Sequence, residues 1–284
     1  LDLMLPKKDG DSLWWKVVQR GKRNITLNLS SEKGREIFFT LVGDCDALIE
    51  NFRPGTLERW KIGPAELEAA GANLALLRIS GYGQTGPSRD RPGFGAIGEA
   101  MSGFVHLNGF PDGPPVFPST SLADGVASVF GAFGVMAALL NKARNKGTGV
   151  EVIDVALFEG LFRIVPTQMA WFDQLGKAPI RPGNFLGEHG VLRNVYRASD
   201  GKYLIVSSVG PQAIRRILTG AGADELVRQL DAGAMDNRET GDVYAFLSAC
   251  DVHLHAWAGK RTYAELAKDL TSHDAVFGPV LDAA

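Results

Sequence analysis

The sequence predicts an α/β protein whose first part is an open, doubly wound parallel sheet and whose second part is a smaller α+β region. Two observations lead to this prediction. Up to about residue 155, short strands that are apolar on both faces alternate with helical segments, which is typical of a parallel sheet covered by helices. After residue 183, two alternating runs flank a turn and are followed by helical segments, which indicates a hairpin packed with helices.

The elements of the first part follow one another from residue 30. Ser30-Ser31-Glu32 precedes an apolar run, as at the start of a capped amphipathic helix. Pro54 ends one element and begins the next. The remaining expected elements are strands at 47–50, 74–79 and 150–155, helical pieces at 57–60 and 64–70, and a long helix at about 121–145.

The second part begins where Arg181-Pro182-Gly183-Asn184 interrupts the alternation. We expect a hairpin from the runs 195–197 and 203–207 around Ser199-Asp200-Gly201, then helices near 211–231, 239–250 and 262–270. The predicted domains are therefore residues 1–182 and 183–284. Because Leu1 is not a start methionine and no opening strand precedes Ile25, we also expect the chain to be truncated at both ends.

Composition limits the possible partners. The net charge is −2 with both signs interspersed, so no basic field is available for nucleic acid or an anionic membrane. The longest apolar stretches, such as 126–140, are shorter than the ~20 residues that cross a bilayer, and we expect no transmembrane segment. Cys45 and Cys250 are far apart in sequence and suggest no disulfide framework, which fits a cytoplasmic protein.

Residues 93–98, Gly-Phe-Gly-Ala-Ile-Gly, match the dinucleotide-binding pattern G-x-G-x-x-G. That pattern has its physical meaning only where it closes a strand and opens a helix. Here it follows a polar loop, so we expect neither a nicotinamide nor a flavin site. The five histidines show no metal-ligand spacing, and we expect no metal.

A second candidate site lies after the strand at 47–50, where open α/β sheets bind ligands. Asn51-Phe52-Arg53-Pro54-Gly55 is followed by Arg59, which places two guanidinium groups around a turn and a helix start. Such a pair suits a phosphate. The alternative is two solvated arginines paired with Glu50 or Glu58.

Asp124 is the most informative residue. It opens a helix that is apolar on all sides, so we expect the helix to be buried and its lone carboxylate to stand near the interior in the first turn, where the helix dipole favours the ionised form. A partly desolvated carboxylate is a competent nucleophile toward a thioester. A helix-capping aspartate is the alternative.

Taken together, the motifs resemble the class III CoA-transferase family, also called CaiB/BaiF. They occur in the family's order within residues 20 to 165. The similar stretches are Gly21-Lys22-Arg23-Asn24-Ile25-Thr26-Leu27, Glu50 to Gly55 with Arg59, Ser80-Gly81-Tyr82-Gly83-Gln84-Thr85-Gly86-Pro87, Met101-Ser102-Gly103, Leu122-Ala123-Asp124-Gly125, and Gly147-Thr148-Gly149 with Asp154-Val155-Ala156.

The resemblance implies that Asp124 attacks an acyl-CoA carbonyl and passes CoA to a carboxylic acid through an aspartyl anhydride and an aspartyl-CoA thioester. It implies that Asn51, Phe52, Arg53 and Arg59 line the CoA nucleotide, with CoA as the substrate and carrier. It further implies a Rossmann-like large domain, a small domain and an interlocked homodimer.

Two departures bear on the activity. Relatives that racemise 2-methylacyl-CoA carry a His-Asp pair where this sequence has Phe94-Gly95, which disfavours racemisation. The glycine run that opens the small domain in formyl-CoA transferases is represented only by Gly187-Glu188-His189-Gly190. A racemase or isomerase, a non-catalytic acyl-CoA-binding protein and a dinucleotide oxidoreductase remain the competing functions.

Overall fold

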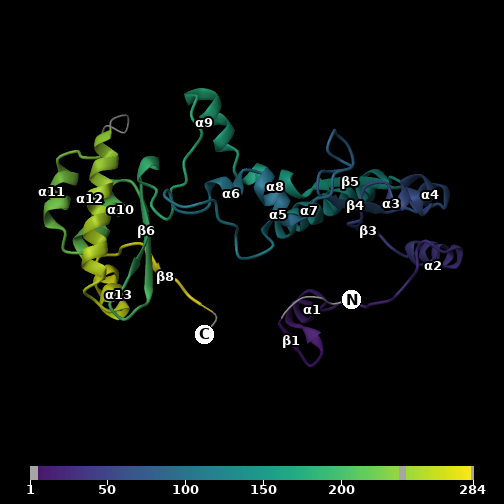
Figure 1. Cartoon of the computed structure of the whole chain (residues 1–284), viewed down its shortest axis with the longest axis horizontal. Coiled ribbons are helices and arrows are strands. Elements are labelled where there is room, and N and C mark those ends of the chain that lie inside the picture. Colours follow the sequence, from purple (N-terminus) through teal and green to yellow (C-terminus); the bar gives the residue numbers. More distant parts are fainter. Residues whose placement is uncertain (1–5, 237–240, 283–284) are drawn as a thin grey trace. The chain divides into compact units, whose positions relative to one another are not determined.

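The computed structural model describes residues 6–236 and 241–282. It has the mixed α/β fold expected from the sequence, and its contacts divide it into two compact units. Unit 1 comprises Leu1–Gly98 with Ala123–Gly160, and unit 2 comprises Glu99–Leu122 with Leu161–Ala284. Figure 1 labels the elements of both units. The domain boundary predicted between residues 182 and 183 stays a prediction.

A parallel sheet forms the centre of unit 1. Its strands β3 (Ala47–Glu50), β4 (Ala75–Ser80) and β5 (Glu151–Ala156) are arranged in the order β3-β4-β5. The register pairs Glu50 with Arg78 and Ser80 with Ala156. The predicted parallel sheet is thus confirmed, and each strand lies within one residue of its expected bounds. Because all three strands run the same way, the loops that follow them meet at one edge of the sheet.

Short helices cover one side of this sheet. They are α2 (Glu32–Val42), α3 (Thr56–Arg59) and α4 (Pro64–Ala69). Ser31 caps α2, because its hydroxyl accepts the N–H of Gly34 at 3.1 Å. A cluster that includes Phe38, Leu57, Leu67 and Leu76 forms the core between these helices and β4. The chain before α2 holds β1 (Lys7–Lys8), β2 (Asp11–Ser12) and α1 (Leu13–Val18).

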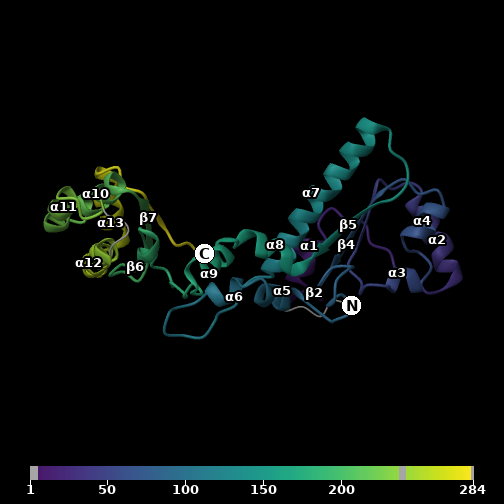
Figure 2. The ribbon, with the colours of Figure 1, turned by 90° about the horizontal axis from the view of Figure 1, so that it is seen from above.

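The long helix α7 (Leu122–Asn145) lies along β4 and β5, as Figures 1 and 2 both show. Two glycines bring it close to the sheet. A Cβ atom at Gly131 would lie 2.6 Å from the Leu77 side chain, and one at Gly134 would lie 2.9 Å from Ile153. Since only glycine permits this approach, the helix packs through its backbone against the strands.

The opposite side of α7 is exposed among the residues that the structure describes, and the prediction of a fully buried helix was wrong. Val129 is 70% exposed and Phe133 is 74% exposed. The helix has 24 residues, with a mean hydropathy of 1.7 in its most apolar window, and 28% of that window is buried. By length and composition alone α7 is long enough to cross a membrane, which the shorter apolar run at 126–140 does not indicate.

Unit 2 is built on an antiparallel sheet. Its strands β6 (Val191–Arg197), β7 (Tyr203–Val209) and β8 (Phe277–Pro279) follow the order β6-β7-β8. The first two strands form the hairpin expected from the sequence, with Arg197 opposite Tyr203. β8 was not predicted, because three residues give no clear alternation. The helices are α5 (Gly95–Met101, shared with unit 1), α6 (Phe104–Leu107), α8 (Leu157–Ile164, also shared), α9 (Thr167–Leu175), α10 (Pro211–Gly220), α11 (Asp224–Asp231), α12 (Gly241–Ala258) and α13 (Tyr263–Ser272), with a 3₁₀ turn at Gly187–His189.

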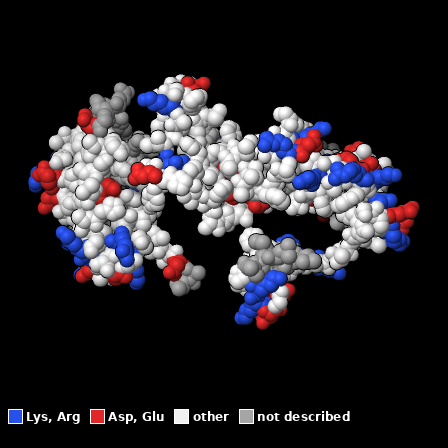
Figure 3. Space-filling view, in the orientation of Figure 1, with Lys and Arg blue, Asp and Glu red and all other residues white. Residues whose placement is uncertain are grey.

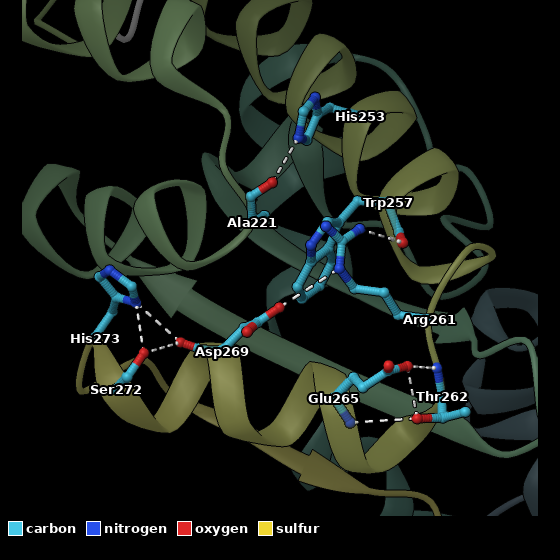
Figure 4. A network of polar contacts seen from close by, with 9 residues as sticks. All are labelled: Ala221, His253, Trp257, Arg261, Thr262, Glu265, Asp269, Ser272 and His273. Atoms are coloured by element: carbon cyan, nitrogen blue, oxygen red, sulfur yellow. Dashed lines mark hydrogen bonds and ion pairs between the residues drawn. The ribbon is translucent and has the colours of Figure 1, made fainter.

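The junction between α12 and α13 is fixed by polar contacts, which Figure 4 shows from close by. Arg261 donates to the carbonyl of Trp257 at 3.4 Å, and its Nε lies 3.5 Å from Oδ2 of Asp269. Thr262 caps α13, because its hydroxyl accepts the N–H of Glu265 while the Glu265 carboxylate accepts the N–H of Thr262. These contacts hold α13 against the apolar core of unit 2. The polar contacts thus lie at the edge of that core, where α12 ends and α13 begins.

Candidate functional site

A cavity of about 180 Å³ lies at the edge of unit 1 where the parallel strands end. It is formed by the segments that directly follow β3, β4 and β5, together with the loop before α5 and the first turn of α7. Its lining residues are Asn51, Phe52, Arg53, Pro54, Ile79, Ser80, Gly81, Arg91, Pro92, Gly93, Phe94, Asp124 and Leu157. This is the position at which open α/β sheets bind ligands. The structure thus brings Asn51, Phe52 and Arg53 together with Asp124 around one cavity.

An ion-pair network holds the segment that follows β3. Arg78, which is 5% exposed, donates from Nε to Glu50 at 2.7 Å and from Nη1 to Glu58 at 2.7 Å. The other oxygen of Glu50 accepts the N–H of Phe52 at 2.7 Å. The hydrogen bonds from Arg78 hold the pKa of Glu58 below its ordinary value. Burial lowers the pKa of Arg78, but its bonds to both carboxylates raise it by more. The network fixes the direction in which the chain leaves β3.

This network bears on the alternative interpretation of Arg53 and Arg59, in which these arginines are paired with Glu50 or Glu58. Both carboxylates form ion pairs with Arg78, and the charge of Arg59 makes a smaller contribution to the lowered pKa of Glu58. Arg53 is exposed on the cavity, and within the described ranges no ion pair involves it. Arg59 does not line the cavity. It ends α3 and donates to the hydroxyl of Thr56 at 2.8 Å.

The segment that follows β4 is held by Asp154 on β5. The N–H of Gln84 donates to Oδ2 of Asp154 at 2.8 Å. Gly83 has a φ of +82°, and a Cβ there would lie 3.3 Å from the same carboxylate oxygen. Glycine is required at this turn by its backbone conformation, while the carboxylate fixes the path of the loop.

The glycines of the G-x-G-x-x-G pattern serve close packing in this structure. A Cβ at Gly93 would lie 3.1 Å from both Gly81 Cα and the Tyr82 ring. A Cβ at Gly98 would lie 3.0 Å from Leu157. The pattern follows the loop at 81–92, and α5 begins at its third residue, Gly95, with no strand directly leading into it among the described residues. The strand context that gives the dinucleotide pattern its meaning is therefore missing.

Asp124 lies in the first turn of α7. The start of this helix is fixed by Glu99, which is 3% exposed and accepts the N–H of Leu122 at 2.9 Å. The Asp124 residue itself is exposed and lines the cavity, so its expected place near the interior was wrong while its place in the first turn was right. Its carboxylate lies against Gly95, where a Cβ atom would overlap Oδ2 and lie 3.0 Å from Cγ.

Two further polar residues of the cavity were not predicted as site residues, although Ser80 begins one of the stretches that resemble the family. Ser80 is 7% exposed, and its hydroxyl has no hydrogen-bond partner among the residues that the structure describes. Arg91 lies on the loop before α5, with its guanidinium 5.5 Å from the centre of the Tyr82 ring. The rule that ligands bind beyond strand ends could have indicated Ser80, since it ends β4. Nothing in the sequence links Arg91 to Asp124.

The arrangement suits an anionic ligand. Two guanidinium groups, Arg53 and Arg91, share the cavity with one carboxylate, Asp124, so the three charged side chains sum to a positive charge. On the face drawn in Figure 3, by contrast, Lys and Arg are interspersed with Asp and Glu. In the described part of the chain, no group of three or more His, Cys, Asp or Glu residues could hold a metal ion.

Comparisons with known proteins show the family to which the chain is similar. Residues 3–284 match the sequence profile described as CoA-transferase family III. The chain is 38% identical over 217 residues to succinyl-CoA–D-citramalate CoA-transferase of Chloroflexus aurantiacus, covering 76% of this chain and 53% of that protein. It is 34% identical to acetyl-CoA:oxalate CoA-transferase of Acetobacter aceti, covering 98% of this chain and 70% of that protein.

A solved structure shares the fold. The crystal structure of a CaiB/BaiF family protein from Brucella suis superposes with a TM-score of 0.77 at 26% identity. The match covers 92% of this chain and 67% of that chain. The chain thus spans between about half and 70% of the length of the proteins named here.

Proposed function

Because the chain belongs to CoA-transferase family III, we propose that it moves coenzyme A between an acyl-CoA thioester and a carboxylic acid, with Asp124 as the nucleophile. The observation that carries the proposal is the shared cavity. Asp124 and the segment Asn51-Phe52-Arg53 line one hollow at the carboxyl ends of the parallel strands. A carboxylate in that position can meet a thioester whose nucleotide part is held beside it.

The reaction divides into exchanges between acyl derivatives of similar energy. A carboxylate oxygen of Asp124 attacks the thioester carbonyl, and the C–S bond breaks to give a mixed anhydride and CoA thiolate. The thiolate then attacks the aspartyl carbonyl and releases the donor acid. The acceptor acid attacks the resulting aspartyl thioester, which again gives an anhydride and CoA thiolate. Attack of that thiolate on the acceptor carbonyl forms the new acyl-CoA and restores Asp124.

We assign the binding of the CoA nucleotide to Asn51, Phe52, Arg53 and Arg59. The ring of Phe52 packs edge-on against Trp60 at 5.0 Å, which fixes the segment between β3 and α3. Arg53 is available for a phosphate, because Arg78 has already taken the neighbouring carboxylates. Arg59 lies outside the cavity and is assigned a more distant anionic group of the nucleotide.

A racemase on the same scaffold receives no support from this geometry. The proton transfers of racemisation need a second acid/base group, which related racemases carry where this chain has Phe94-Gly95. Position 95 has no room for a side chain while Asp124 keeps its place, because a Cβ atom there would overlap the carboxylate. The site therefore supports transfer through one carboxylate.

We further propose that the protein acts as a homodimer in the cytoplasm. The exposed apolar face of α7 supports an association, since Val129, Phe133 and Met136 are each at least 66% exposed and contiguous apolar surface of this kind marks interaction sites. Sedimentation of the full chain would test the dimer. A monomer at micromolar concentration would contradict it.

The test of the transfer is the Asp124→Ala variant, assayed with a panel of acyl-CoA donors and free carboxylic acids. We expect transfer to fall to background while CoA still binds, since the variant keeps the loop after β3. Asp90→Asn, an exposed residue outside the cavity, is the matched control and should keep full activity. Unchanged transfer in Asp124→Ala would refute the assignment. Binding of acyl-CoA by a wild-type chain that transfers none of it would indicate a non-catalytic binding protein.

A further inference from the structure

Arg91 has no role in the reaction as proposed above, although it lines the same cavity as Asp124. Within the described ranges no carboxylate pairs with its guanidinium, whereas Arg89 on the same loop lies 3.5 Å from Asp90. An arginine that faces a cavity without an acidic partner is available for an anionic group of a ligand.

The guanidinium is held in place through aromatic contacts. It lies 5.5 Å from the centre of the Tyr82 ring, within the range of a cation–π contact. The Tyr82 ring in turn lies 6.3 Å from the ring of Phe158 and borders Gly93. Arg91 thus rests on a ring that is itself packed within unit 1, which restricts the guanidinium before any ligand binds. A group that is already ordered loses less conformational freedom when a ligand binds.

The chain geometry keeps Arg91 near the reacting carboxylate. Gly95, where a Cβ atom would overlap the Asp124 carboxylate, is four residues further along, and four residues span at most about 14 Å when fully extended. The cavity that Arg91 and Asp124 line has a volume of about 180 Å³. This volume is below the roughly 300 to 1,000 Å³ of pockets that hold drug-sized ligands. The space fits an acyl group of a few carbons, with its reacting end at Asp124.

We infer that Arg91 recognises the free carboxylate of a dicarboxylic acyl group whose thioester end reacts with Asp124. This rests on the proposed function and names its substrate class. A carboxylate at the far end of a short acyl chain matches a planar guanidinium, which can donate two parallel hydrogen bonds to it. Arg53, on the segment after β3, binds the phosphates of CoA, and Arg91 binds the free carboxylate of the acyl group.

The inference is tested by comparing succinyl-CoA with butyryl-CoA, two four-carbon donors that differ in the terminal carboxylate. Transfer to a common monocarboxylic acceptor is measured for the wild type and for Arg91→Gln. The loss of a hydrogen bond to a charged group costs about 1.5–3 kcal/mol, so kcat/KM for succinyl-CoA should fall roughly 10- to 150-fold. The value for butyryl-CoA should change less than about threefold, because that substrate leaves Arg91 unused.

Two controls complete the test. Arg89→Gln removes a neighbouring exposed arginine from the same loop and should leave kcat/KM unchanged for both donors. Affinities of both thioesters are also measured in the Asp124→Asn background, where no turnover consumes them. Adding Arg91→Gln to this background should weaken succinyl-CoA alone and leave free CoA unaffected.

The outcomes separate the two claims. Equal losses for both donors, or weaker binding of free CoA, would show that Arg91 contacts the coenzyme and would overturn the inference while leaving the transferase proposal in place. A wild type that transfers nothing but binds succinyl-CoA through Arg91 would refute the transferase proposal and keep the recognition of the carboxylate.

Discussion

Gly95 leaves no room for a Cβ atom, because that atom would overlap Oδ2 of Asp124. The two residues come from different elements, α5 and α7, and their contact sets where the carboxylate can lie. Glycine at position 95 is therefore a requirement of the site as well as of the packing. This relationship gives a direct test of how strictly the carboxylate must be placed.

Gly95→Ala should lower transfer by about 100-fold or more, because a displacement of roughly 1 Å at a reacting group can cost that much. The measurement is kcat/KM together with a thermal unfolding curve that confirms a folded chain. Gly125→Ala is the matched control. It also adds one methyl group beside Asp124 in the first turn of α7, but nothing lies within 4 Å of its Cβ position. Equal activity of the two variants would contradict a fixed carboxylate.

Ser80→Ala should lower kcat/KM by about tenfold, the value of one hydrogen bond, and should leave the free energy of unfolding unchanged or slightly higher. The Ser80 hydroxyl is buried and has no partner in the described part of the chain, so its removal costs the fold nothing. Ser208 is a second buried hydroxyl without a hydrogen-bond partner among the described residues; it lies on β7 in unit 2 and does not line the cavity, so Ser208→Ala should change neither quantity. A loss of more than about 1 kcal/mol in the Ser80 variant would show that the hydroxyl is bonded within the fold.

Arg78→Met should destabilise the protein by about 3–5 kcal/mol, since it leaves the Glu50 carboxylate, 4% exposed, without its partner. Chemical denaturation at neutral pH measures this directly. The double variant Arg78→Met with Glu50→Gln should recover much of the loss. A single variant as stable as the wild type would mean that water compensates the buried charge.

The Arg78–Glu58 pair should contribute stability that depends on pH. The pKa of Glu58 is lowered in the folded state by its bonds to Arg78, so the contribution is present above its unfolded value of about 4.3 and is lost as the pH falls through the folded-state pKa. Glu58 is 45% exposed in its side chain, and solvent screening limits the effect to under about 1 kcal/mol.

Glu58→Gln should therefore be less stable than the wild type at pH 7 and equally stable at the lowest pH at which both remain folded. Urea unfolding at a series of pH values gives the comparison. A constant difference between the two proteins at every pH would exclude the carboxylate as its cause.

The sequence predicted the strands of unit 1 well because their apolar runs are bounded by turn residues. It predicted the bounds of α7 but not its burial, because an apolar helix gives no sign of which neighbours cover it. Val129 and Phe133 are exposed for that reason. Periodicity within one chain cannot show whether a partner surface exists.

The sequence predicted the site residues that belong to local motifs, but not the contacts between segments that are distant in sequence. The pairing of Glu50 with Arg78 depends on the register of two strands that are 28 residues apart, which no local pattern specifies. Arg91 reaches the cavity because Gly93 packs against Gly81, a contact between loops. The sequence placed Arg59 with Arg53, but α3 carries Arg59 away from the cavity lining.

The central claim is that Asp124 carries the acyl group and then CoA. It is tested most directly by mixing the protein with an acyl-CoA donor, adding hydroxylamine, and locating the modified residue by peptide mass analysis. The account predicts one aspartyl hydroxamate, at Asp124, that forms only when donor is present. Turnover without that product, or with the modification at another carboxylate, would contradict it.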